Sequence, residues 1–78
     1  MKAQKYSFKD KEYNEYQLPN GATTLAELDD VIACAECGKK LTFASSYTSR
    51  TIHTKIGMGY SVCNSCYIVE RAKEKEYR

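Results

Sequence analysis

Two pairs of cysteines are the side chains in this chain best suited to chemistry. Cys34 and Cys37 form one Cys-x-x-Cys pair, and Cys63 and Cys66 form the second. A gap of two residues lets both sulfurs of one turn face a common centre, and zinc binds four thiolates as a tetrahedron with Zn–S distances of about 2.3 Å. Because four thiolates leave no coordination position for water, the sequence predicts one structural Zn²⁺ ion held by all four cysteines.

Two other uses of the cysteines are open but less favoured. A redox pair of the thioredoxin kind needs a βαβ context for which 78 residues leave no room. A disulfide framework suits exported proteins, whereas the N-terminus here has no apolar signal segment. No apolar run reaches the roughly 18 residues of a membrane span. We therefore expect a cytoplasmic protein with reduced thiols, no membrane association and bound metal.

The length of the chain also argues for a metal. A single domain of this size buries only about 60% of the surface that its unfolded chain exposes. Aliphatic side chains are few, and seven of the nine aromatic residues are tyrosines. A core of that composition gives only marginal stability unless a metal ion or a cross-link supplements it. We therefore expect zinc binding to contribute directly to folding.

The residues that follow each pair predict the architecture. Gly38 can take the left-handed conformation that closes a zinc knuckle after Cys37. Residues 41–62 are rich in Thr, Ser, Tyr and Ile and favour a β-hairpin. Cys66 has no glycine after it and instead begins a helical pattern, whose free amides would stabilise thiolates. Residues 34–78 are thus expected to form a small, metal-stabilised α+β fold, a treble-clef zinc finger of knuckle, hairpin and C-terminal helix. A zinc ribbon is the alternative.

Residues 1–33 form a charged, tyrosine-rich N-terminal segment outside the finger. Residues 1–17 are either a tail or an edge strand. After a Pro-Asn-Gly turn, Thr24 and Glu27 have the spacing of a capping box, and Leu25, Leu28 and Ile32 follow at helical spacing. We therefore predict a short helix at about 24–33, packed as a lid on the finger.

The motifs of residues 34–75 resemble treble-clef zinc fingers. Cys-x-x-Cys-Gly-Lys at residues 34–39 is similar to the C-terminal finger of short bacterial transcription regulators of the DksA/TraR kind. Cys-Asn-Ser-Cys-Tyr at residues 63–67, following a Gly-Tyr-Ser-Val strand, is similar to the last helix of GATA-type fingers. The resemblance implies zinc binding, and in GATA fingers the helix and nearby loops read DNA.

Positive charge is concentrated in residues 37–69, which contain four bases and no carboxylate. One interpretation is that these basic side chains contact phosphates. The other is that their positive charge balances the negative zinc–thiolate centre and keeps the edge of the hairpin soluble. The candidate contact residues, including one interleaved tyrosine, are Lys39, Lys40, Tyr47, Arg50 and Lys55. In the C-terminal helix the charges alternate in sign, and we expect Tyr67, Ile68 and Ala72 to face inward.

These observations predict a binding module and not an enzyme. His53, the only histidine, lacks the second histidine that a metal-dependent nuclease of the HNH type needs, and we interpret it as an ordinary strand residue. We expect a small adaptor, regulator or inhibitor that acts on a protein partner in transcription or replication, through its tyrosines and the acidic N-terminal helix. The alternative is a zinc finger that binds DNA or RNA through the basic hairpin. Neither hypothesis involves a small-molecule substrate.

Overall fold

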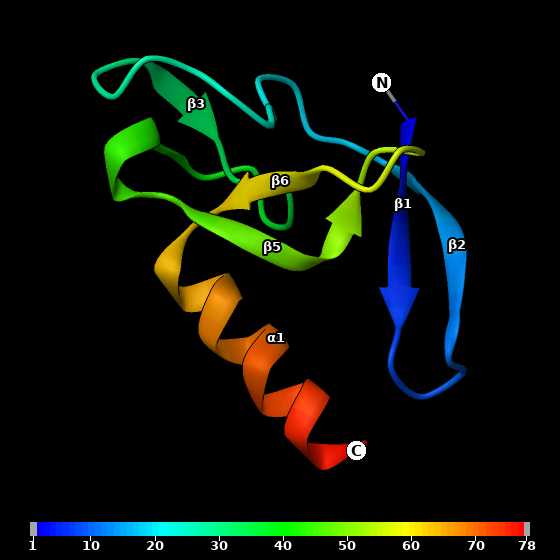
Figure 1. Cartoon of the computed structure of the whole chain (residues 1–78). Helices are drawn as coiled ribbons and strands as arrows, with labels where there is room; N and C mark the ends of the chain where they lie inside the picture. Colours follow the sequence, from blue (N-terminus) through cyan, green and yellow to red (C-terminus); the bar gives the residue numbers. More distant parts are fainter. Residues whose placement is uncertain (1, 78) are drawn as a thin grey trace.

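Strands from both ends of the chain meet in one sheet of an α+β fold (Figure 1). The computed structural model describes residues 2–77. A four-stranded antiparallel sheet has the order β2-β1-β5-β6, and β3 and β4 form a separate hairpin. In chain order the elements are β1 (Lys2–Ser7), β2 (Glu12–Gln17), β3 (Val31–Ala33), β4 (Lys40–Thr42), a 3-10 turn (Phe43–Ser45), β5 (Tyr47–His53), β6 (Gly59–Val62) and α1 (Asn64–Glu76). No helix in residues 2–77 has the length and apolarity needed to cross a membrane.

The N-terminal segment is a β-hairpin that extends the sheet. β1 and β2 pair in regular register from Lys2 opposite Gln17 to Ser7 opposite Glu12. β1 also pairs with β5, but only through Gln4 and Lys5, after which the two strands diverge. Of the two alternatives for residues 1–17, the strand is therefore the correct one, and β2 is the edge of the sheet.

The predicted helix at about 24–33 is wrong. Residues before β3 form turns and bends, and β3 pairs with β4. A helix of about two turns is marginal unless its apolar stripe is buried. Here Ile32 and Ala33 turn inward as part of a strand, while Leu25 and Leu28 stay exposed. Polar side chains bond to the local backbone instead of capping a helix: the Leu25 N–H donates to Thr23 Oγ1 at 3.3 Å and the Glu27 N–H to Asp30 Oδ2 at 3.1 Å.

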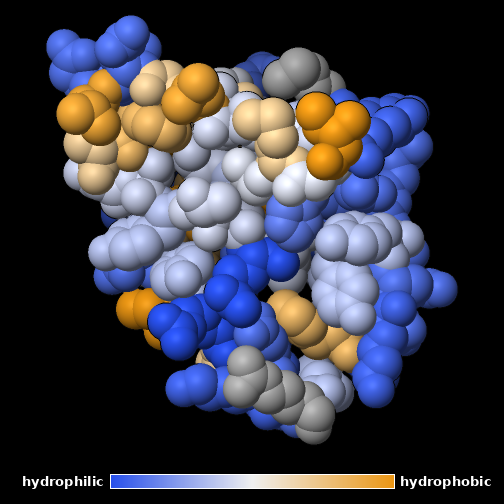
Figure 2. Space-filling model, in the orientation of Figure 1, coloured by the Kyte–Doolittle hydropathy of each residue, from blue (hydrophilic) through white to orange (hydrophobic). Residues whose placement is uncertain are grey.

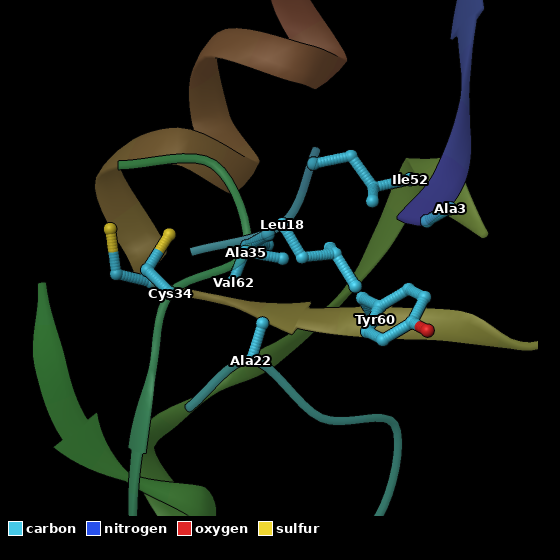
Figure 3. Packing of buried hydrophobic residues seen from close by; sticks show 9 residues of the cluster. Ala3, Leu18, Ala22, Cys34, Ala35, Ile52, Tyr60 and Val62 are labelled. Atoms are coloured by element: carbon cyan, nitrogen blue, oxygen red, sulfur yellow. The ribbon is translucent and has the colours of Figure 1, made fainter. Parts of the chain in front are cut away.

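The hydrophobic core is small and contains two of the cysteines. Figure 3 shows Leu18, Tyr60 and Val62 gathered on one side of the sheet, with Cys34 at the margin of the cluster. Among the described residues, the largest side chains that are fully buried are those of Ile52, Val62 and Cys34. The cluster of cysteines is thus continuous with the core, since Cys34 and Cys63 belong to both.

α1 packs on β5 through a buried carboxylate. The oxygens of Glu70 lie 2.6 and 2.9 Å from Ser49 Oγ, and Oε1 accepts from Thr51 Oγ1 at 3.0 Å and from the Arg50 N–H at 3.1 Å. On the solvent side, the Arg50 guanidinium forms two hydrogen bonds to Glu74. Cys66 and Tyr67 of α1 pack against the core, whereas Ile68 and Val69 are exposed. Our prediction that Ile68 and Ala72 face inward is wrong, since both are exposed; Tyr67 is partly buried.

Removal of the Glu70 carboxylate tests how α1 is attached. We expect Glu70→Ala to lower the free energy of unfolding of the metal-loaded protein by about 2–4 kcal/mol, because the buried Ser49 and Thr51 hydroxyls lose their acceptor. The matched control is Glu76→Ala on the exposed part of the same helix, with an expected change within about 0.5 kcal/mol. Urea denaturation followed by circular dichroism measures both. Equal effects of the two substitutions would contradict this role of Glu70.

Candidate metal centre

The first cysteine pair lies in a tight turn directly after β3. The Gly38 N–H donates to the Cys34 carbonyl at 2.9 Å, and the Cys34 N–H donates to the Lys39 carbonyl at 2.8 Å. Gly38 has φ +80°, in the left-handed region that side chains with a Cβ rarely adopt. The turn predicted from Cys-x-x-Cys-Gly is therefore present, and it directs the sulfurs of Cys34 and Cys37 to the same side.

The second pair lies at the start of α1. Cys63 is the N-cap residue of the helix, and Cys66 lies in its first turn. A backbone hydrogen bond of 2.9 Å from the Ala35 N–H to the Ser61 carbonyl joins the knuckle to β6, just before Cys63. The unpaired amides of the first helical turn face this region, so the helix supplies a positive electrostatic potential where thiolates gather.

The four sulfurs converge on one point. All four Sγ atoms lie within 4.8 Å of one another, and those of Cys37 and Cys63 are 3.9 Å apart. Ligands at about 2.3 Å from a tetrahedral centre are separated by about 3.8 Å. Cys34 and Cys63 are buried, Cys66 is partly exposed and Cys37 is exposed. The residues present therefore fit a four-sulfur metal site that is open to solvent on one side.

The thiols differ in their readiness to ionise. Burial disfavours the Cys34 thiolate, but hydrogen bonds from the backbone at Cys37, Cys63 and Glu36 outweigh it and lower the pKa of Cys34 from 9.0 to about 7. Burial and the neighbouring sulfurs raise the pKa of Cys66. The pKa of Cys37 is also raised, despite a hydrogen bond from the Lys39 backbone that lowers it, because burial and the Cys34 sulfur act against ionisation. A divalent cation is what would allow all four sulfurs to be thiolates together.

The N-terminal hairpin holds the knuckle in place. Tyr16 Oη lies 2.8 Å from the Ala35 carbonyl oxygen and 3.2 Å from that of Glu36. Lys5 Nζ forms an ion pair with Glu36 Oε1 at 2.7 Å and lies over the Tyr16 ring, 5.2 Å from its centroid. Burial, followed by the Glu36 carboxylate, raises the pKa of Tyr16, so its hydroxyl remains a donor. These contacts link β1 and β2 to the peptide between the first two ligands.

The structural roles of Tyr16, Lys5 and Glu70 have no counterpart among the residues predicted from the sequence. Each bonds to a group that lies far away along the chain, in the knuckle or in β5. No local sequence motif predicts a hydrogen bond or ion pair between residues so far apart in the chain. The only available signal was that tyrosine, when buried, usually finds a hydrogen-bond partner for its hydroxyl.

The predicted contact residues lie on several different elements. Lys39 and Lys40 lie in the knuckle and β4, and Lys55 lies in the turn between β5 and β6. Arg50 lies in β5, where the Glu74 carboxylate raises its pKa and neutralises its charge. Tyr47, at the start of β5, stacks on Tyr67 of α1 with ring centroids 5.1 Å apart.

His53 lies at the end of β5, opposite Gln4 of β1 and Gly59 of β6. Its ring makes an edge contact with Tyr13, with centroids 6.0 Å apart, and its Nδ1 is buried without a hydrogen-bond partner among the described residues. It is not part of the four-cysteine cluster. This position is that of a sheet residue, as the sequence predicted.

No family model, curated protein or solved structure matches this chain. Any relation to known zinc fingers therefore depends on the cysteine motifs and on the geometry described above.

Metal uptake should be coupled to proton release. Near neutral pH the Cys37 and Cys66 thiols hold their protons, whereas Cys34, with a pKa of about 7, is partly ionised. Ligands must be thiolates, so we expect the apparent affinity for Zn²⁺ to fall as the pH is lowered from 8 to 6. Titration calorimetry in buffers of different ionisation enthalpy measures the released protons. A binding heat that is independent of the buffer would contradict this prediction, and a chain with all four cysteines replaced by serine should take up no metal.

Proposed function

We propose that this protein is a small, non-catalytic module built on one structural zinc ion, which acts as an adaptor or regulator by binding a protein partner. The observation that carries the proposal is the convergence of the four sulfurs at the boundary of a very small core. Zinc suits the site because four soft sulfur ligands at tetrahedral spacing are its preferred structural environment.

Zinc binding at this site would supply the stability that the core lacks. Structural zinc contributes on the order of 10 kcal/mol of apparent free energy in small fingers. A domain typically has a net stability of only about 5–15 kcal/mol. The ion would join the knuckle, the end of β6 and the first turn of α1, which are held together otherwise by the small core and a few backbone hydrogen bonds.

The order of the elements around the site supports a finger of the treble-clef type. A knuckle carries Cys34 and Cys37, a hairpin of β5 and β6 follows, and α1 carries the second pair. Two features add to that plan. The hairpin of β1 and β2 extends the sheet, and β3 and β4 flank the knuckle. A closed shell of four thiolates would give no substrate access to the metal, which supports a structural role for it.

The segment of residues 25–31, which we call the acidic loop, is the proposed partner surface. Leu25, Leu28 and Val31 are 74%, 69% and 68% exposed. Figure 2 shows apolar surface gathered over the loop that leads into β3. Residues 18–36 contain four carboxylates and no lysine or arginine. Exposed aliphatic side chains among acidic residues indicate an interaction site for a partner with an apolar patch ringed by basic side chains.

The acidic loop is held in shape, which reduces the entropy lost on binding. The Ala44 N–H donates to the Leu28 carbonyl at 3.0 Å, and the Phe43 N–H donates to the Asp30 carbonyl at 2.9 Å. The Asp30 N–H donates in turn to the Glu27 carbonyl at 3.1 Å. The loop is thus fixed to the turn that follows β4, and it presents its aliphatic side chains without a helix.

The structural role of zinc is tested by removing one buried ligand. We expect Cys63→Ser to lose stoichiometric zinc and the cooperative thermal transition, because three thiolates cannot complete the shell. Ser65→Ala, two residues further along and exposed, is the matched control and should retain both. Metal analysis and differential scanning calorimetry of the reduced proteins measure the outcome. A Cys63→Ser protein with full metal content and a sharp transition would refute the proposal.

The partner surface is tested by making the acidic loop polar. We expect the double substitution Leu25→Ser and Leu28→Ser to leave zinc content and thermal midpoint unchanged and to abolish capture of a stoichiometric protein from an extract of the source cells. Ile56→Ser, at an exposed aliphatic residue in the turn after β5, should leave capture intact. Quantitative mass spectrometry of the captured proteins compares the three chains. If the captured set is the same for all of them, the acidic loop is not the partner surface.

A further inference from the structure

A cleft opens between the N-terminal hairpin and the C-terminal half of α1, away from the cysteines. β1 separates from β5 after Lys5, and α1 runs beside the hairpin of β1 and β2 (Figure 1). The cleft has a volume of about 310 Å³, and its floor includes Thr51 and Glu70. That volume is at the lower end of the range for small-molecule sites, about 300–1,000 Å³.

The charges available in the cleft are positive. Lys9 lies on the hairpin wall and Lys73 on the helix wall, both exposed. Neither forms an ion pair within the part of the chain that the structure describes. Lys5 also lines the cleft, but its ammonium group is held by Glu36. The carboxylate of Glu70 accepts hydrogen bonds from β5, so its oxygens are already occupied.

Aromatic rings stand on both walls beside these lysines. Tyr6 and Phe8 are on the hairpin wall, in edge-to-face contact with ring centroids 5.4 Å apart. Tyr77 is on the opposite wall, 41% exposed, at the end of α1. Two ring-bearing walls suit a flat ligand, because every nucleobase has a face that stacks on aromatic side chains. Two unpaired ammonium groups on opposite walls suit a phosphate.

We propose that this cleft binds a nucleotide, with the base among Tyr6, Phe8 and Tyr77 and the phosphate between Lys9 and Lys73. The nucleotide is either free in solution or part of a single strand of nucleic acid, and the same groups serve both. The proposal is independent of the acidic loop, and it locates nucleotide binding in the cleft rather than in the scattered residues Lys39 and Lys55.

The test is a titration of the zinc-loaded full chain with thymidine monophosphate and, separately, with an eight-nucleotide thymidine strand. Changes in the NMR chemical shifts of the backbone amides report binding. We expect saturable shifts at residues that line the cleft. Binding of the monophosphate identifies a free nucleotide as the ligand, and binding of the strand alone identifies single-stranded nucleic acid. No saturable shift with either probe at low salt would overturn the proposal.

Substitutions then assign the roles of the residues. Tyr77→Ala should weaken binding about fivefold or more, the effect of losing one stacked base. Lys9→Ala and Lys73→Ala should each weaken binding and, for the strand, reduce the slope of log affinity against log salt by about 0.7. Lys39→Ala and Lys55→Ala are matched controls, and binding should be unchanged in both. All five variants should retain full zinc content, because their side chains lie outside the four-sulfur cluster.

Two results of this series would contradict the proposal. One is loss of binding in the two control variants while Lys9→Ala and Lys73→Ala bind fully. This result would locate the site at the knuckle and at the turn between β5 and β6. The other is equally tight binding of a hexaglutamate peptide, which would show that the cleft responds to negative charge alone and that the aromatic rings do not select a base.

Discussion

The shortage of apolar material in the interior is the constraint on which the rest of this structure depends. Three sizeable side chains are completely buried among the described residues, and one of them, Cys34, belongs to the four-cysteine cluster. A core of that size cannot fix the position of a knuckle, a sheet and a helix at once. The four sulfur atoms converge from two segments, the knuckle and the start of α1, and a metal ion bound between them would fix these segments at a single point.

Polar contacts take over where apolar packing is absent. The hydroxyl of Tyr16 bonds to carbonyl groups of the knuckle, and the carboxylate of Glu70 bonds to two hydroxyls and an amide of β5. Buried bonds of this kind are directional, and leaving one partner unsatisfied is costly. They therefore fix the angle at which the hairpin and the helix lie against the sheet, which nonspecific apolar contact would not do.

Local sequence signals correctly predicted the clustering of the four cysteines, but they gave the wrong secondary structure for residues 24–33, just before the first pair. Two Cys-x-x-Cys pairs, Gly38 and the helical pattern after Cys63 each encode geometry within a few residues, and the structure has all of these features. The apolar spacing of Leu25 and Leu28 predicted a helix, but pairing between β3 and β4 prevails there. From sequence alone the N-terminal hairpin stays open between a tail and a strand because its apolar pattern is too short to identify a strand, and its attachment to the sheet depends on β5, far along the chain. The burial of Glu70 could not be predicted for the same reason. It depends on hydrogen bonds from hydroxyl groups of β5, which lies far from Glu70 in the sequence.

The pairing of β1 with β5 has a consequence for synthesis. A nascent chain emerges N-terminus first, so the hairpin of β1 and β2 has no further strand to pair with until β5 has followed it, and the second cysteine pair comes later still, with α1. Contacts between such distant segments make folding slower than contacts between near neighbours. Until β5 is available, the edge of β1 that pairs with it is uncovered and open to pairing with other chains. Closure of the sheet along this edge must therefore wait for β5, so the order of the strands itself sets an interval during which β1 is exposed.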